Sequence, residues 1–206
     1  MEFITIALLH LFAVVSPGPD FVLITRQSIR YNRNIAIWAS LGIATGILVH
    51  SLVAITGVVV IVTSNSFLFD AIKIVGAVYL LYLGIISIIN SNKIKELTTT
   101  VSGKKENLNG FLAGLITNIT NVKAILFFVT VFTVVIDQNT DRLTLSFYGI
   151  YMSISTFFWF AFISVVFTDK RFTSKFSFYL PVFEKIIGLI LIMISSQIFL
   201  TQANIL

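Results

Sequence analysis

The first apolar stretch of the chain, Phe3–Thr25, reads FITIALLHLFAVVSPGPDFVLIT and carries SPGPD at positions 16–20. About 20 apolar residues are enough for a helix to cross the hydrocarbon core of a bilayer. Pro17, Gly18 and Pro19 cannot remain in one regular helix, because each proline lacks a backbone N–H and glycine adds backbone freedom. Lipid cannot bind the released backbone groups, so the stretch predicts a broken membrane span whose break lines a cavity.

The composition of the whole chain fits a membrane protein. Of the 206 residues, 57% are hydrophobic and 11% are charged, and the mean hydropathy is +0.98. Soluble domains carry about a quarter charged residues, so this chain could not cover a water-facing surface. The absence of cysteine excludes disulfides and thiolate metal sites. We attribute the net charge of +5 to basic loops that face anionic lipid, and no basic helix interleaved with aromatics indicates nucleic acid.

Five further apolar stretches of spanning length follow the first. The sequence therefore predicts an all-α, multi-pass membrane protein with six transmembrane helices in one domain, 1–206. The start of the chain lacks the basic region and the cleavage site of a signal peptide, so we expect the first span to be retained. The predicted spans are Phe3–Thr25, Ile35–Val62, Phe67–Ile89, Gly110–Ile136, Leu143–Phe167 and Pro181–Leu200.

Lysine and arginine concentrate in alternate loops, and such loops face the cytoplasm. Loops one, three and five hold nearly all of the basic loop residues, whereas loops two and four hold only Arg142. This asymmetry predicts that loops one, three and five are cytoplasmic and that both termini lie outside. The basic residues of these three loops are Arg26, Arg30, Arg33, Lys93, Lys95, Lys104, Lys105, Lys170, Arg171 and Lys175.

The two halves of the chain look related. A shift of 103 positions places Asp20 on Lys123, and KIVG at 73–76 recurs as KIIG at 185–188. Three spans per half force the copies into opposite orientations, as in the inverted repeats of many secondary transporters, whose substrate sites lie between the repeats. The expected boundaries are repeat one at 1–90, a cytoplasmic loop at 91–109 and repeat two at 110–206.

Two charged residues lie inside apolar spans. Asp20 follows the break in span one, where the free N–H groups of a new half-helix favour an anion; the alternative is a capping residue at a kink. Lys123 lies near mid-membrane in span four, where a lysine costs at least about 3 kcal/mol on insertion scales. It needs a partner or a water-filled pocket; the alternative is a buried contact that only holds the bundle together. Asn118 and Asn121 precede it on roughly the same helix face.

Glycines recur at helical spacing in spans two and three. Gly42, Gly46, Gly76 and Gly84 predict close packing of helices, which would also allow a homodimer. His50 follows Gly46 by four residues and therefore lies on the same face. It is a candidate proton carrier, because histidine titrates near physiological pH. The alternative is an interhelical hydrogen bond.

Motifs in four spans together resemble one known family, the LysE/RhtB-type amino-acid exporters of bacterial inner membranes. The resemblance covers the whole chain. Its family motif in span four usually reads Asn-Pro-Lys, and this chain has Val122 in place of the proline. Without that proline, span four need not be broken. The motif residues are Ser16, Pro17, Gly18, Pro19 and Asp20; Gly42, Gly46 and His50; Lys73, Gly76, Ala77, Tyr79, Leu80 and Gly84; and Phe111, Gly114, Asn118, Asn121, Lys123, Leu126, Phe127 and Phe128.

The resemblance implies export of amino acids from the cytoplasm, driven by the proton motive force. An amino-acid zwitterion needs an anion and a cation, which Asp20 and Lys123 could supply; in the empty state the two could neutralise each other. No acidic pocket indicates a basic substrate, so we favour neutral amino acids such as homoserine, threonine or leucine. Proton coupling is assigned to His50 or Asp20. The expected binding residues are Ser16, Pro17, Gly18, Pro19, Asp20, Asn118, Asn121 and Lys123.

Two other classes of function are open from the sequence. A transporter of a metal cation would need more inward-facing carboxylates or histidines than Asp20, His10 and His50. A non-transporting membrane scaffold would gain little from a broken span and a mid-membrane lysine. No hydrolase, metalloprotease or nucleotide-binding motif is present, so we expect neither an enzyme nor a cofactor.

Overall fold

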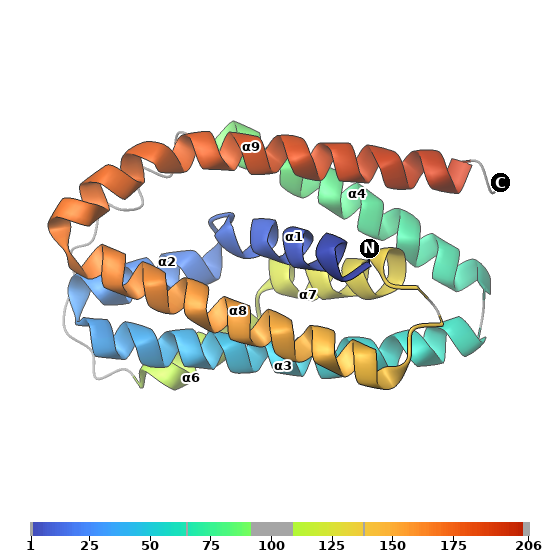
Figure 1. The fold of residues 1–206 in the computed structure, drawn as a ribbon, viewed down its shortest axis with the longest axis horizontal. Helices are drawn as coiled ribbons and strands as arrows, with labels where there is room; N and C mark the ends of the chain where they lie inside the picture. The colour runs from blue at the N-terminus through green and yellow to red at the C-terminus, as the bar shows by residue number, and fades with distance from the viewer. Residues whose placement is uncertain (1, 65, 92–108, 138, 204–206) are drawn as a thin grey trace.

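The structure is a computed structural model that describes residues 2–64, 66–91, 109–137 and 139–203 (Figure 1). Throughout these ranges the ordered elements are helices. The predicted loop at 91–109 lies almost wholly outside the described residues. The elements are α1 (Glu2–Val15), α2 (Pro19–Arg30), α3 (Arg33–Ser64), α4 (Ser66–Asn90), α6 (Gly110–Ile119), α7 (Val122–Thr130), the π-helical turn η2 (Val131–Val135), α8 (Arg142–Thr168) and α9 (Lys170–Ala203).

Among the described residues, two helices are long and apolar enough to cross a bilayer alone, Arg33–Gly57 in α3 and Arg142–Thr168 in α8. The number rises to four if each bent pair of helices is one span. These pairs are α1 with α2, bent by 52°, and α6 with α7 and η2, bent by 55°. The apolar parts of α4 and α9, Ile74–Ile89 and Lys185–Leu200, are shorter. The chain is an all-helical membrane protein, and its six spans stay a prediction.

The structure settles one point that the sequence left open and corrects one expectation. Span four, which need not be broken without the proline of the related family, is broken before Val122. Loop five is helical, because α9 begins at Lys170 and runs through Pro181. The polar sequence KRFTSKFSF was expected to be a loop, but it contains neither glycine nor proline, so nothing in it stops a helix.

Two of the three basic loops lie at the same end of the molecule. The α2–α3 turn and the α8–α9 junction lie together at the left of Figure 1, whereas the α3–α4 turn and the start of α8 lie at the right. Arg33 begins α3 at the first end, and Arg142 begins α8 at the second. This arrangement matches the charge asymmetry of the loops, while the orientation in the bilayer stays a prediction.

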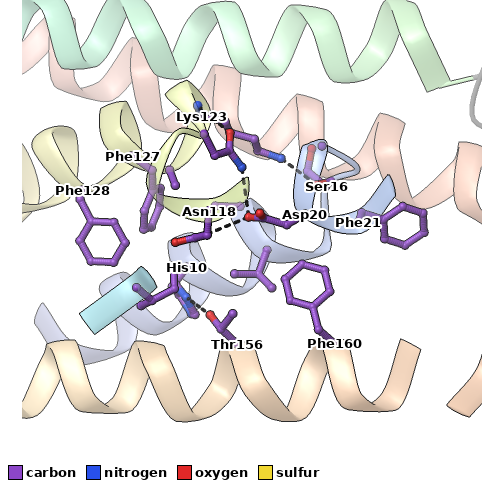
Figure 2. Close-up of a pocket in the computed structure, with 16 residues that line it drawn as sticks. His10, Ser16, Asp20, Phe21, Asn118, Lys123, Phe127, Phe128, Thr156 and Phe160 are labelled. Carbon is purple, nitrogen blue, oxygen red and sulfur yellow. Dashed lines mark hydrogen bonds between the residues drawn. The ribbon is translucent and has the colours of Figure 1, made fainter. Parts of the chain in front are cut away.

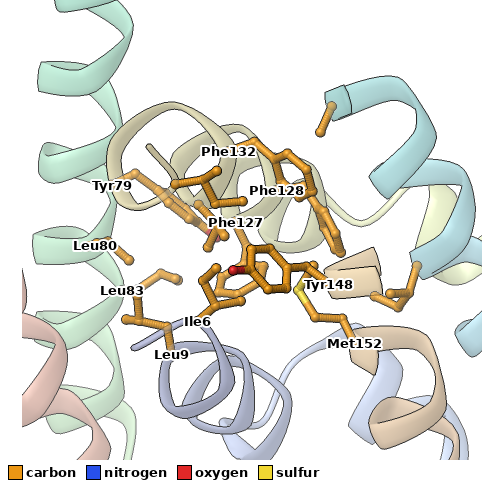
Figure 3. Packing of buried hydrophobic residues seen from close by; sticks show 14 of the residues in the cluster. Ile6, Leu9, Tyr79, Leu80, Leu83, Phe127, Phe128, Phe132, Tyr148 and Met152 are labelled. Atoms are coloured by element: carbon orange, nitrogen blue, oxygen red, sulfur yellow. The ribbon is translucent and has the colours of Figure 1, made fainter. Parts of the chain in front are cut away.

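Two clusters of buried side chains fix the two halves of the first broken span. The larger cluster includes Leu9 of α1, together with Leu80 of α4 and Phe128 of α7 (Figure 3). The smaller cluster includes Phe21 of α2 and Phe167 of α8. Because α1 and α2 are anchored in different clusters, the packing holds the break between them in place.

The contact between α3 and α6 is a close approach of two backbones. A Cβ atom added at Gly42 would clash with the carbonyl oxygen of Phe111, and one added at Gly114 would clash with that of Ala39. Glycine at such positions lets helices approach more closely than any other residue allows. This contact places the C-terminal end of α6, and with it the second break, against α3.

The glycines of α4 are also occupied within the chain. A Cβ added at Gly84 would lie 2.7 Å from the carbonyl oxygen of Gly188 in α9, and one added at Gly76 would lie 3.0 Å from the hydroxyl oxygen of Thr130 in α7. Gly42 and Gly46 likewise face α6. All four predicted packing glycines therefore lie at contacts inside one chain and give no support to the homodimer.

Candidate functional site

At the first break, Lys123 binds a backbone carbonyl that the helix has released. α2 begins at Pro19, which has no N–H, and the Nζ atom of Lys123 donates to the carbonyl oxygen of Ser16 at 2.7 Å (Figure 2). The lysine side chain passes Gly18, where an added Cβ would lie 3.3 Å from its Cδ atom. The hydroxyl oxygen of Ser16 lies 3.2 Å from that of Ser87 in α4. Side chains from α7 and α4 thus hold this break.

At the second break, asparagine does what proline was expected to do. Asn121 is the N-cap of α7: its backbone is extended, and its side-chain oxygen accepts from the N–H of Lys123 at 3.0 Å. The N–H of Asn121 and the Nε2 atom of His50 each lie 3.0 Å from the carbonyl oxygen of Asn118. An N-cap asparagine satisfies the free donors of a new helix as well as any residue does. The break therefore needs no proline.

Replacing Val122 with proline should preserve the fold and raise its stability by roughly 0.4–1 kcal/mol. Val122 is the first residue of α7 and 64% exposed, and Asn121 before it has φ −75° and ψ 104°, which a following proline favours. Thermal unfolding of the purified protein in detergent measures the change. A loss of more than about 1 kcal/mol would mean that α7 does not begin at this residue.

The carboxylate of Asp20 lies between the two breaks. Its Oδ2 atom accepts from the side-chain amides of Asn118 at 2.9 Å and of Asn121 at 3.0 Å (Figure 2). Its Oδ1 atom is buried and has no hydrogen-bond partner among the described residues. This oxygen can therefore still accept a hydrogen bond from a donor that enters the site.

Asp20 and Lys123 occupy matching places in the two broken spans. Asp20 is the second residue of α2, and Lys123 is the second residue of α7. Tyr79 of α4 donates to the carbonyl oxygen of Lys123 at 2.8 Å and fixes the first turn of α7. One half-helix thus brings an acidic side chain to the site and the other brings a basic side chain. Direct neutralisation of Asp20 by Lys123 stays a prediction.

A cavity of about 40 Å³ lies between these groups. It has room for water, but small-molecule pockets usually begin at roughly 300 Å³. An amino acid could therefore enter only if the walls moved apart. The polar side chains that line the cavity are His10, Ser16, Asp20, Asn118, Asn121, Lys123 and Thr156.

The structure brings most of the predicted binding residues together. Besides the polar side chains, Gly18 lines the cavity, whereas Pro17 and Pro19 do not. Gly46 lies against Asn118, because a Cβ there would clash with the Asn118 side-chain oxygen. That oxygen has no hydrogen-bond partner among the described residues either.

His50 does not line the cavity. Its ring stacks on Phe128 at 5.7 Å, and Nε2 lies 3.0 Å from the Asn118 carbonyl oxygen. Because a carbonyl only accepts, Nε2 carries a hydrogen in this contact. The contact is the interhelical hydrogen bond that the sequence left as an alternative, and a role in proton coupling stays a prediction.

Sequence reasoning did not place three kinds of residue at the site. His10 had no assigned role in binding, and Thr156 and the aromatic residues Phe127 and Phe160 had none either, although all four line the cavity. Phe127 belongs to the span-four motif, which gave it no role in binding. No local motif marks His10, Thr156 or Phe160, because they reach the site through the packing of α1 and α8. Within the described part of the chain, no group of three or more histidine, aspartate or glutamate side chains is placed to hold a metal ion.

Comparison with known proteins gives matches over most of the chain. The family model described as LysE type translocator matches residues 11–202. The threonine efflux protein of Escherichia coli K12 is 31% identical over 172 residues, which cover 81% of this chain and 82% of that protein. The threonine efflux protein of Salmonella typhi is 30% identical over 171 residues with the same coverage. The uncharacterized membrane protein YrhP of Bacillus subtilis is 29% identical over 187 residues, 87% of this chain and 89% of YrhP. No solved structure gives a significant match.

Proposed function

Because this chain belongs to the LysE type translocator family, we propose that it is a secondary transporter that exports neutral amino acids from the bacterial cytoplasm in exchange for protons. It would act in the inner membrane, and the cavity between the two broken spans would be its binding site. The observation that carries the proposal is the buried Oδ1 atom of Asp20, which has no hydrogen-bond partner among the described residues; Asp20 lines the cavity together with Lys123.

The two ends of an amino-acid backbone fit these groups. The substrate ammonium donates to Oδ1 of Asp20, an ionised acceptor that gives a strong charge-assisted hydrogen bond. The substrate carboxylate takes the place of the Ser16 carbonyl on Lys123 and meets the free N–H groups at the start of α2 near Gly18. Asp20 is the only carboxylate among the lining residues, so a second cationic group on the side chain would find no partner.

Proton coupling follows from competition for one carboxylate. A proton on Asp20 removes the charge that holds the substrate ammonium, so proton and substrate exclude each other at this residue. This exclusion is what exchange of a substrate for a proton requires. His50 is the second candidate, since it contacts the carbonyl of Asn118, whose amide donates to Asp20.

Six spans in two inverted repeats, 1–90 and 110–206, would supply the rocking motion around this site. Three observations support the repeats. The two breaks are 103 positions apart, and their bends are 52° and 55°. In α4 and α9, a Cβ at Gly84 would meet the carbonyl of Gly188, and a Cβ at Gly188 would meet that of Gly84. This reciprocal contact relates residues that are 104 positions apart. KIVG at 73–76 and KIIG at 185–188 are separated by more than this shift, so they are not equivalent residues of the two repeats.

The test is efflux of labelled amino acids from bacterial cells loaded with dipeptides, with and without the expressed protein. We expect faster efflux of neutral amino acids, abolished by an uncoupler, and no change for lysine or arginine. If protein shown to be inserted accelerates no amino acid, the proposed function is wrong. Faster efflux that persists in the presence of the uncoupler would support export of amino acids but exclude its coupling to protons.

A further inference from the structure

The cavity has a second polar end, formed by His10 of α1 and Thr156 of α8. Figure 2 shows this pair across the cavity from Lys123. The two side chains are 2% and 0% exposed. The Nε2 atom of His10 lies 3.0 Å from the hydroxyl oxygen of Thr156, and its Nδ1 atom lies 3.2 Å from the hydroxyl oxygen of Ser155. Nothing in the export of an amino-acid backbone uses this pair.

The Thr156 hydroxyl is not used by its own helix. Serine and threonine inside helices often donate to the carbonyl oxygen four residues earlier, as Ser164 and Thr168 do in α8. Among the described residues, the only hydrogen-bond partner of the Thr156 hydroxyl is His10. The hydroxyl therefore keeps unused hydrogen-bonding capacity at the wall of the cavity.

The His10–Thr156 contact can offer either a donor or an acceptor. If Nε2 accepts the Thr156 proton, the threonine oxygen keeps a lone pair for another donor; if Nε2 carries the hydrogen, the threonine proton is free to donate. Ser155 is compatible with either protonation of the His10 ring. Its hydroxyl can donate to Nδ1 of His10, or it can accept from Nδ1 and donate to the carbonyl oxygen of Met152, which lies 3.2 Å away. Such a pair suits a group that is both donor and acceptor, namely a hydroxyl or a carboxamide.

We propose that Thr156, positioned by His10, hydrogen-bonds the side chain of the exported amino acid and thereby determines which neutral side chains are accepted. This inference rests on the proposed function and extends it to the far end of the same cavity. Between the two ends the wall is apolar, with Ile47, Phe127 and Phe160. Such a site favours a side chain with a hydroxyl over its aliphatic isostere, because the isostere leaves the buried hydroxyl of Thr156 without its partner.

The test is the ratio of threonine to valine efflux, two amino acids of nearly the same shape, per amount of inserted protein. Thr156→Val should lower this ratio about tenfold, the effect of one lost buried hydrogen bond. Thr156→Ser keeps a hydroxyl and should keep the wild-type ratio. The matched control is Ser153→Ala, which removes another buried hydroxyl of α8, one that donates to the Ala44 carbonyl at 2.8 Å and does not line the cavity. This control should leave the ratio unchanged.

An unchanged ratio in Thr156→Val, or an equal fall in Ser153→Ala, overturns the inference while the proposed function stands. If Thr156→Val does not insert, His10→Leu is measured in its place. This variant removes the contact that positions Thr156, so it should also lower the ratio of threonine to valine efflux. The wild-type protein separates the two claims. If it exports no neutral amino acid at all, the proposed function itself has failed, whereas export of other neutral amino acids without preference for threonine over valine overturns only this inference.

Discussion

Replacing Asp20 with asparagine should abolish amino-acid export from protein that still inserts and folds. Asparagine has nearly the same shape, and its side-chain oxygen can still accept from the amides of Asn118 and Asn121. What is lost is the charge that holds the substrate ammonium in the proposed site. Removing one partner of a buried charge pair costs about 2–5 kcal/mol, which is roughly a 30-fold to several-thousand-fold loss of binding.

The measurement is efflux of labelled threonine from dipeptide-loaded cells, divided by the amount of inserted protein. The matched control is Asp137→Asn, the same chemical change at an exposed residue that does not line the cavity. The control should export within about a factor of two of the wild type, as expected for a surface change of less than 0.5 kcal/mol. Asp20→Asn protein that exports at the wild-type rate would exclude the ammonium site.

A single methyl group at Gly42 should destabilise the fold by about 3 kcal/mol or more. A Cβ there would overlap the carbonyl oxygen of Phe111 and come within 2.7 Å of the N–H nitrogen of Leu115, both on the backbone of α6. Neither atom can move without shifting the whole helix, so the change exceeds ordinary overpacking, which costs about 1–3 kcal/mol. Because α6 carries Asn118, the displacement should also lower export.

Gly57→Ala is the matched control for this change, since it adds the same methyl group to the same helix. Apart from the adjacent backbone of α3, no atom of the described residues lies within 4 Å of the position that its Cβ would take. Alanine favours helix over glycine, so this variant should be unchanged or more stable by up to about 1 kcal/mol. Thermal unfolding in detergent compares the two variants. Equal stabilities would show that α3 and α6 do not meet at Gly42.

The features that the sequence predicted are those set by local chemistry. The break in the first span is confirmed, because Pro17, Gly18 and Pro19 exclude regular helix in any environment. The sequence also predicted that Asp20 and Lys123 share one polar site, since a charged side chain inside an apolar span needs a partner or a water-filled pocket. The structure places both residues on the same cavity.

The features that the sequence did not predict depend on distant neighbours. The second break rests on Asn121 as a cap and on His50, which contacts the carbonyl of Asn118 from another helix. The far end of the cavity joins His10 to Thr156, 146 residues later, and neither side chain belongs to a local pattern. Such pairs are decided by helix packing, which a single sequence does not reveal.

The most direct test of the account is exchange of a labelled amino acid by the purified protein in liposomes, where no other exporter is present. Liposomes are loaded with labelled threonine, and unlabelled threonine is added outside. The account predicts that the wild-type protein releases the label faster than empty liposomes do, and that Asp20→Asn does not. No accelerated release by correctly folded wild-type protein, for threonine or any other neutral amino acid, would contradict it.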